Sequence, residues 1–292
     1  MLLTRKKEIG VRAIFSVAAS FSILIVFLVF LFLAREALPF VREPGLTTLW
    51  GAIWRPISFQ QPLFGILPLL SGSILVTGLA GLITAPLGIG GAVYIAEVAQ
   101  PWERELLKPI IEVLAGIPSV VLGFFGLAVV APAVKAMFGL NSGLTALTGA
   151  LVLALMALPT VISVSEDAIR SVPESFKQAS LALGATTQQT IWGVVVPAAI
   201  PGITAATMLG FGRIIGETMA VLMVTGNAAT FTLNPFDSVR TMTATIANEM
   251  GEVPFGSTHY QALFCVGMVL LFSTFLLNIL ALRMFKHYGL RQ

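Results

Sequence analysis

Apolar stretches long enough to cross a membrane recur along this 292-residue chain, and they leave few folds open to it. A helix needs about 20 apolar residues to span the hydrocarbon core of a bilayer. The stretches are continuous and do not alternate with a period of two, which favours helices over a closed β-barrel. The chain is 57% hydrophobic and only 11% charged, against about 25% charged residues in a soluble domain. We therefore expect an all-α, polytopic membrane protein.

About six transmembrane helices are predicted, and they form a single permease-like domain over residues 1–292. Their approximate limits are 13–33, 67–96, 113–134, 144–164, 198–224 and 262–284. The second span is longer than a bilayer requires and contains Pro86 followed by a glycine cluster, which predicts a kink or a tilt. The glycine clusters lack the strand–turn–helix setting of a dinucleotide site. We interpret them as places of close helix packing.

The distribution of lysine and arginine between the predicted loops indicates the orientation of the spans. One side carries Arg5, Lys6, Lys7, Arg12, Arg104, Lys108, Arg170, Lys177, Arg283, Lys286 and Arg291, and the other carries Arg35, Arg42, Arg55, Lys135 and Arg240. The richer side is cytoplasmic by the positive-inside rule, so both termini are predicted to be cytoplasmic. Because these residues lie at span ends rather than in one patch, the net charge of +3 does not predict nucleic-acid binding.

The segment between the fourth and fifth spans, residues 166–196, has the local pattern of two helices separated by a turn. Ser171 precedes a glutamate by three residues, the spacing of a capping box, and predicts a short helix from there to Leu183. Gly184 follows where a left-handed residue would end that helix. Thr186 precedes a glutamine by three residues, and this second capping box would open a helix that enters the fifth span.

The same segment resembles the cytoplasmic loop with which ABC importer permeases dock on their ATPase. The family pattern is Glu-Ala-Ala, three residues, Gly, nine residues, Ile, one residue and Leu-Pro. In this chain Gln178 replaces the Glu, Ser180 replaces an Ala, and the final aliphatic triplet keeps Pro197. On the first helix of the segment, four residues share one face: Phe176, Ala179, Ser180 and Leu183. The resemblance implies an ATPase-docking surface that consists of Phe176, Gln178, Ala179, Ser180, Leu183, Gly184 and Pro197.

The fifth span carries Arg213 and Glu217, two residues that are costly to insert into a bilayer. A central arginine costs about 2.5–3.5 kcal/mol on insertion scales, so both side chains are expected to face the interior of the bundle or a wet cavity. Because they are four residues apart, they would share one face of a continuous helix. This predicts a substrate pathway or a buried ion pair that holds helices together, and the two roles can coexist.

Residues 211–221, with the pattern Arg-x-x-Gly-Glu-Thr at their centre, resemble the fifth helix of phosphate importer permeases, and PstC-type subunits more than PstA-type ones. Residues 94–97 and 116–119 are similar to the second and third helices of that family. The resemblance extends over about residues 67–278 and implies the type I ABC importer permease fold. It assigns to the substrate pathway Arg213, Glu217 and Thr218.

The function implied by this resemblance is that of a transmembrane permease subunit in an ATP-driven importer of inorganic phosphate. The implied location is the bacterial or archaeal cytoplasmic membrane. The implied partners are a second, PstA-like permease, a PstB-like ATPase dimer and an extracytoplasmic, PstS-like phosphate-binding protein. The chain is not expected to be an enzyme, because it has no Gly-x4-Gly-Lys-Ser/Thr loop for ATP. Neither a cofactor nor a metal is expected, since His259 and His287 are separate and Cys265 is the only cysteine.

The sequence leaves three alternatives to phosphate import open. The substrate could be another oxyanion, such as sulfate or molybdate. A secondary transporter could couple transport to protons through Glu217 and would need no ATPase, so dependence on ATP or on a proton gradient separates the two mechanisms. A membrane scaffold that transports nothing would leave substrate flux independent of the chain.

Overall fold

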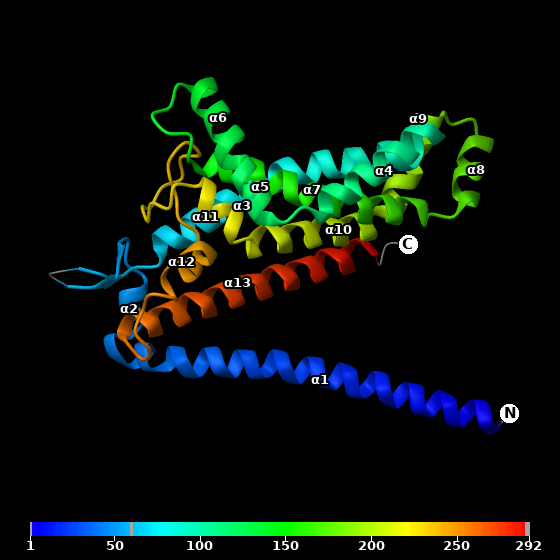
Figure 1. Cartoon of the computed structure of the whole chain (residues 1–292). Coiled ribbons are helices and arrows are strands. Elements are labelled where there is room, and N and C mark those ends of the chain that lie inside the picture. Colours follow the sequence, from blue (N-terminus) through cyan, green and yellow to red (C-terminus); the bar gives the residue numbers. More distant parts are fainter. Residues whose placement is uncertain (1, 59–60, 290–292) are drawn as a thin grey trace.

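The structure, a computed structural model, describes residues 2–58 and 61–289. Within these residues it contains six helical segments that are long and apolar enough to cross a membrane, which confirms the predicted helical, polytopic fold. They are Phe15–Leu49, Leu67–Val98, Ser119–Phe138, Ala146–Arg170, Thr187–Gly216 and Thr258–Ile279. Figure 1 shows most of them as long helices that run between two ends of the molecule, whereas the end of Ser119–Phe138 turns away from the others.

The elements follow one another in the chain, and the connection over residues 225–241 is longer than the others. The first half contains α1 (Leu2–Phe40), the turn η1 (Val41–Gly45), α2 (Leu46–Leu49), β1 (Trp54–Arg55), β2 (Leu63–Phe64), α3 (Leu67–Val93), the π-helical turn η2 (Tyr94–Val98), α4 (Pro101–Gly116), α5 (Ser119–Phe125), the π-helical turn η3 (Gly126–Val130) and α6 (Ala131–Phe138). The second half contains α7 (Ala146–Arg170), α8 (Glu174–Ala182), α9 (Thr187–Thr190), the π-helical turn η4 (Ile191–Val195), α10 (Val196–Gly216), α11 (Met219–Val224), α12 (Met242–Glu249) and α13 (Thr258–Gly289).

The centre of the bundle is helix α7, which packs against both α3 and α10. Small residues allow these helices to approach closely. A Cβ atom on Gly88 of α3 would lie 2.6 Å from Cγ1 of Val161 on α7, and Gly210 of α10 faces the same valine. The interpretation of the glycine clusters as close packing is therefore confirmed at Gly88 and Gly210, whereas a Cβ on Gly90 or Gly212 would meet nothing within 4 Å.

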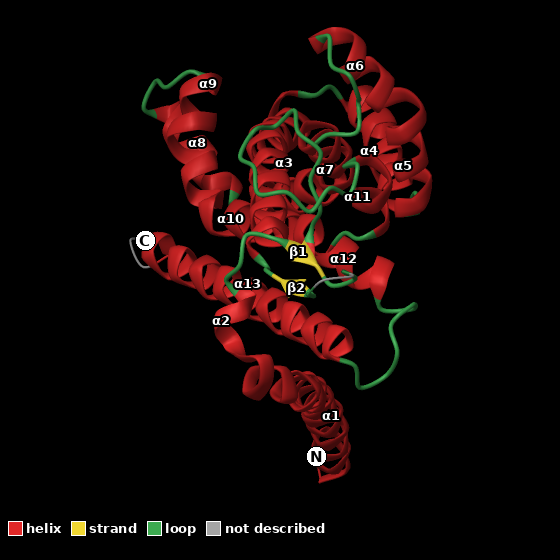
Figure 2. Cartoon of the chain, turned by 90° about the vertical axis from the view of Figure 1, so that its left-hand side faces the viewer, coloured by secondary structure: helices red, strands yellow, loops and turns green. Residues whose placement is uncertain are grey.

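Helix α1 stands apart from this bundle and packs mainly against α13 (Figures 1 and 2). The two helices meet near the β-hairpin, where the buried thiol of Cys265 points at the backbone oxygen of Ala37 at 3.6 Å. Toward the beginning of α1 they diverge (Figure 1). Apolar side chains of α1 from Phe15 to Phe32 are exposed, as expected for a helix that lipid or another subunit surrounds.

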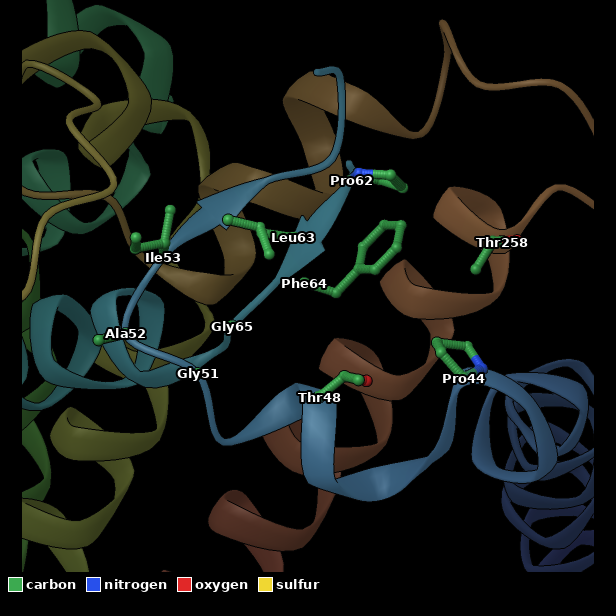
Figure 3. A pocket seen from close by; sticks show the side chains of 10 residues that line it. All are labelled: Pro44, Thr48, Gly51, Ala52, Ile53, Pro62, Leu63, Phe64, Gly65 and Thr258. Carbon is green, nitrogen blue, oxygen red and sulfur yellow. The ribbon is translucent and has the colours of Figure 1, made fainter. Parts of the chain in front are cut away.

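The β-hairpin, α2 and α12 cover one end of the bundle, and α8 lies at the opposite end (Figure 1). In the hairpin, Trp54 pairs with Phe64 in an antiparallel register. The Phe64 ring packs edge-on against Phe40 of α1, with 5.3 Å between the ring centroids. Figure 3 shows the cavity of about 440 Å³ beside the hairpin, where Pro44 and Thr258 lie on the same side of the Phe64 ring. We call this end the hairpin end and the other the α8 end.

The third span begins later than predicted. The predicted span 113–134 crosses a break, because α4 ends at Gly116, and Ile117 is extended with a ψ of 127°. The residue before a proline is disfavoured in the helical conformation, and Pro118 follows Ile117. The residues between the second and third spans, expected to form a short loop, are the helix α4 instead.

The fifth span is also interrupted where a continuous helix was predicted. Helix α10 ends at Gly216, Glu217 is extended with φ −72° and ψ 131°, and α11 begins at Met219. The predicted helix 198–224 is therefore two helices. The spanning segment starts earlier than predicted, at Thr187.

Candidate functional site

The segment between α7 and α10 forms two helices and a turn, as its sequence pattern predicts. Helix α8 ends at Ala182, and Gly184 has a φ of +87°, a value that glycine adopts without the cost that a Cβ brings. The hydroxyl of Thr186 accepts from the backbone N–H of Gln189 at 3.3 Å, and the Gln189 side-chain oxygen accepts from the Thr186 N–H at 2.8 Å. This reciprocal capping box confirms the predicted start of the next helix.

The beginning of this segment differs from the prediction. Residues 166–170 belong to α7, which continues to Arg170. Ser171 does not cap α8, because its hydroxyl donates to the backbone oxygen of Ala168 at 2.7 Å and Pro173 occupies the N-cap position. The hydroxyl therefore binds a carbonyl in the last turn of α7, and this local hydrogen bond forms in place of the predicted capping box.

Helix α8 buries none of its residues, and its apolar side chains are open to a partner. Leu183, just after the helix, is 90% exposed, and Phe176 is about half exposed. Gln178 and Ala179 are exposed as well. Five of the predicted docking residues are thus accessible in and just after α8, and we call them the α8 surface: Phe176, Gln178, Ala179, Leu183 and Gly184.

Ser180 and Pro197, the other two predicted docking residues, lie elsewhere. Ser180 is half-buried, and its Oγ lies 3.0 Å from Oγ1 of Thr190 on α9. Pro197 is in the first turn of α10, about ten residues into the continuous helical segment that Thr187 opens. At 1.5 Å per residue, that is about 15 Å along the helix axis. Ser180 therefore fixes α9 to α8, and Pro197 is separate from the α8 surface.

Arg213 lies in the last turn of α10 and not in the middle of a continuous helix. Its Nη1 donates to Oγ1 of Thr160 on α7 at 3.3 Å. Glu217 accepts from the backbone N–H of Ala220 at 3.1 Å and so caps the start of α11. The predicted shared helix face is therefore wrong, because the helix ends between the two residues, and the described residues contain no ion pair between Arg213 and Glu217.

The break between α10 and α11 is supported from outside by α12. The backbone oxygen of Glu217 accepts from the hydroxyl of Thr243 at 2.9 Å, while the Thr218 hydroxyl donates to the backbone oxygen of Gly216 at 3.3 Å. Sequence reasoning found Arg213, Glu217 and Thr218 but missed Thr160 and Thr243. Hydroxyl side chains inside apolar segments were the available signal, since such groups need a hydrogen-bond partner.

At the hairpin end, the carboxylate of Glu249 on α12 accepts hydrogen bonds from side chains in other parts of the chain. Trp54 Nε1 lies 3.2 Å from both of its oxygens, Arg240 Nη1 lies 2.8 Å from Oε1, and His259 Nε2 lies 2.8 Å from Oε2. The Glu249 side chain is only 12% exposed. His259, isolated in the sequence, is thus part of a network that joins the hairpin, α12 and α13.

Comparisons with known proteins agree with this fold. The family model described as "Binding-protein-dependent transport system inner membrane component" matches residues 88–289. The probable ABC transporter permease protein YqgH of Bacillus subtilis is 44% identical over 227 residues, which cover 78% of this chain and 73% of YqgH. The phosphate transport system permease protein PstC of Mesorhizobium japonicum is 36% identical over 259 residues, covering 81% and 77% of the two chains.

Solved structures of ABC transporters share the fold. A chain of a bacterial ABC transporter involved in the import of the acidic polysaccharide alginate aligns with a TM-score of 0.62 at 17% identity, over 90% of this chain and 92% of that one. A chain of the inward-facing MetNI methionine ABC transporter aligns with a TM-score of 0.58 at 18% identity, over 76% and 96% of the chains. The chain therefore belongs to the family of binding-protein-dependent transport system inner membrane components, and over most of its length it is similar to PstC-type permeases.

Proposed function

We propose that this ABC importer permease subunit conducts inorganic phosphate across the cytoplasmic membrane. The observation that carries the proposal is Arg213, held at the end of a broken spanning helix with a neutral hydroxyl as its partner. The similarity to PstC from Mesorhizobium japonicum supports the choice of phosphate. Permeases of this family are membrane subunits that work with a separate ATPase and a binding protein. We propose a PstB-like ATPase dimer, a PstA-like second permease and a PstS-like phosphate-binding protein for these roles.

An anion that crosses the membrane needs electrostatic compensation. Moving an ion into a medium of low dielectric costs on the order of 20 kcal/mol in the idealised Born estimate, so an anion needs a polar route with a compensating cation. Arg213 is half-buried, and no carboxylate forms an ion pair with it in the part of the chain that the structure describes. Its charge therefore remains available for a phosphate group, which guanidinium binds with favourable geometry.

The fifth spanning helix is interrupted at Glu217 and Thr218. Non-helical backbone at membrane depth is tolerated where it is buried in protein or lines a water-filled cavity. In transporters, discontinuous helices typically form the substrate site. We propose that Glu217 and Thr218 line the same pathway as Arg213. ATP binding to the partner would move α8 and reorient the spans around this pathway.

The orientation belongs to the same proposal. The start of α1, the end of α13 and α8 lie at one end of the molecule (Figure 1), and the lysine and arginine bias makes that end cytoplasmic. Met1 and Gln292 themselves lie outside the described residues. Cysteine labelling in a Cys265→Ser background tests the orientation: a membrane-impermeant reagent should label Thr230→Cys from outside and should not label Ser175→Cys. The reverse pattern would contradict the proposal.

The functional test uses the complete complex in vesicles. Arg213→Gln should abolish phosphate uptake and leave the complex assembled, because the substitution removes the charge and keeps a neutral polar donor on the side chain. ATPase activity with the binding protein loaded with phosphate, with sulfate or with nothing should rise most with phosphate. Retained uptake in Arg213→Gln would give the arginine a structural role only, and stimulation by sulfate or molybdate instead of phosphate would point to another oxyanion.

Glu217→Gln separates two roles of this residue. The glutamine keeps a side-chain oxygen that can cap α11, as Glu217 does through Ala220, but it removes the charge. Reduced uptake in an assembled complex would show that the charge acts in the pathway. Unchanged uptake would limit Glu217 to the helix cap.

A further inference from the structure

Lys177 is the side chain of α8 that connects this exposed helix to the membrane bundle through an ion pair. Its Nζ lies 2.7 Å from Oε1 of Glu97. The two side chains are only 20% and 10% exposed, although α8 otherwise buries none of its residues. An ion pair with so little exposure is screened by salt much less than a surface pair.

Glu97 belongs to a segment that is itself firmly held. It lies in η2, which continues α3, and the chain becomes extended at Ala99. Arg104 of α4 donates from Nε to the backbone oxygen of Ile95 at 2.9 Å and from Nη2 to that of Ala96 at 2.8 Å. A displacement of Glu97 therefore moves η2 together with α4 and the end of α3.

The other end of this connection reaches Arg213. Gly88, less than three turns before Glu97 on the same helical segment, packs against Val161 of α7. The neighbouring residue Thr160 accepts the hydrogen bond from Arg213. Contacts therefore run from α8 through Lys177 and Glu97 to α3. From α3 they continue through Val161 to its neighbour Thr160, which binds Arg213.

The covalent connections of α8 are poorly suited to carry a displacement. Ser171–Pro173 and Leu183–Thr186 are short non-helical connections, and Gly184 has a left-handed backbone with open space around it. Short loops of this kind absorb rotation at hinges. A side-chain contact that bypasses them is needed if α8 and α3 are to move as one body.

We propose that the Lys177–Glu97 ion pair is the positioning contact that makes α3 follow α8 when the ATPase displaces it. The proposal rests on the proposed docking function of α8. Lys177 and Glu97 do not touch substrate or nucleotide. They act by transmitting the motion of one helix to another.

The first experiment measures that motion directly and does not depend on the substrate. Spin labels are placed at Ser175→Cys on α8 and Val98→Cys on η2, both exposed, in a Cys265→Ser background. Pulsed EPR then gives the distance between labels in the complete complex, without nucleotide and with ATP trapped by a hydrolysis-deficient ATPase. With Lys177 intact, the distance should be the same in both states. With Lys177→Gln it should change between them.

The second experiment measures coupling. Lys177→Gln and Glu97→Gln should each lower phosphate uptake per ATP hydrolysed about tenfold, within the usual range of coupling free energies. Both variants should still bind the ATPase, because the α8 surface is unchanged. The double variant should be no worse than either single one, and the charge reversal Lys177→Glu with Glu97→Lys should restore coupling.

The matched control is Glu174→Gln. Oε2 of Glu174 lies 3.7 Å from the same Lys177 nitrogen, but its side chain is 68% exposed, and surface ion pairs contribute little. This variant should change neither the label distance nor the coupling ratio.

Three results would overturn the proposal: a constant label distance in Lys177→Gln, an unchanged coupling ratio, or loss of ATPase binding that charge reversal does not restore. If α8 does not dock the ATPase, Leu183→Asp will leave the affinity for the ATPase intact. That result distinguishes a failure of the docking function from a failure of the ion-pair proposal.

Discussion

Both ends of the molecule hold a nearly buried carboxylate, but they differ in how many side chains bind it. At the hairpin end, Glu249 accepts hydrogen bonds from three side chains and is 12% exposed. At the α8 end, Lys177 forms the ion pair to the bundle, and Leu183 is 90% exposed. Because the partners of Glu249 lie within the chain, this carboxylate stabilises the hairpin end. An exposed apolar patch such as that of Phe176 and Leu183 is typical of a surface that binds another protein.

The largest expected effect is the loss of stability in Glu249→Ala. The change leaves Trp54, Arg240 and His259 without their shared acceptor, and breaking a buried charged network costs on the order of 3 kcal/mol. The midpoint of thermal unfolding in detergent should fall clearly. Glu252→Ala, an exposed carboxylate in the following turn, is the control and should leave it unchanged. Equal midpoints for both variants would show that the hairpin end is no more tightly held than a surface loop.

A smaller loss of stability is expected between the two ends, in Gly88→Ala. The added Cβ would lie 2.6 Å from Val161, and overpacking of this kind costs about 1–3 kcal/mol. Gly90→Ala adds the same atom in open space and serves as the control. Thermal unfolding of the two proteins gives the comparison, and a stable Gly88→Ala protein would mean that α3 and α7 can separate at this point without cost.

Leu183→Asp should weaken binding of the ATPase and leave the fold intact. A central apolar contact is typically worth more than about 1 kcal/mol in an interface, so affinity should fall about tenfold, whereas an exposed site changes stability by about 0.5 kcal/mol or less. Leu233→Asp is the matched control, because this leucine is similarly exposed but lies in the loop after α11. Titration of the purified ATPase against each variant measures the affinities. An equal loss in both would remove the distinction between the two ends.

The smallest change in ATPase binding is expected for Gly184→Val. A β-branched side chain at φ +87° costs about 1–2 kcal/mol locally, and the surroundings are open. The protein should insert at full length, while the turn after α8 is displaced and ATPase binding is reduced. Co-purification with the ATPase is the measurement. Normal assembly and transport would show that this turn does not set the position of α8.

Local patterns allowed the sequence to predict the spans, the left-handed Gly184 and the capping box at Thr186, because each depends on a few neighbouring residues. The break after Gly216 was missed because no proline interrupts the stretch from Gly202 through Val224. What stabilises the break is a hydrogen bond from Thr243, 26 residues away in the chain.

The same limit applies to the candidate site. Arg213 was found because an arginine in an apolar span is conspicuous, but its partner Thr160 is 53 residues away. Glu249 was not singled out, since its donors come from segments up to 195 residues apart. Ser171 shows the converse error, in which a correct spacing predicted a cap and a competing local hydrogen bond prevailed.

The pairing of α1 with α13 also sets a condition on biosynthesis. Helix α1 is made before the five other described spans and packs mainly on α13, and Ala37 and Cys265, which meet in this contact, are 228 residues apart. Domains and segments are made from the N-terminus onward, and membrane helices insert before they associate. Helix α1 must therefore reside alone in lipid while the other spans are translated. It is the most apolar of the six, which suits a helix that waits longest for its neighbour.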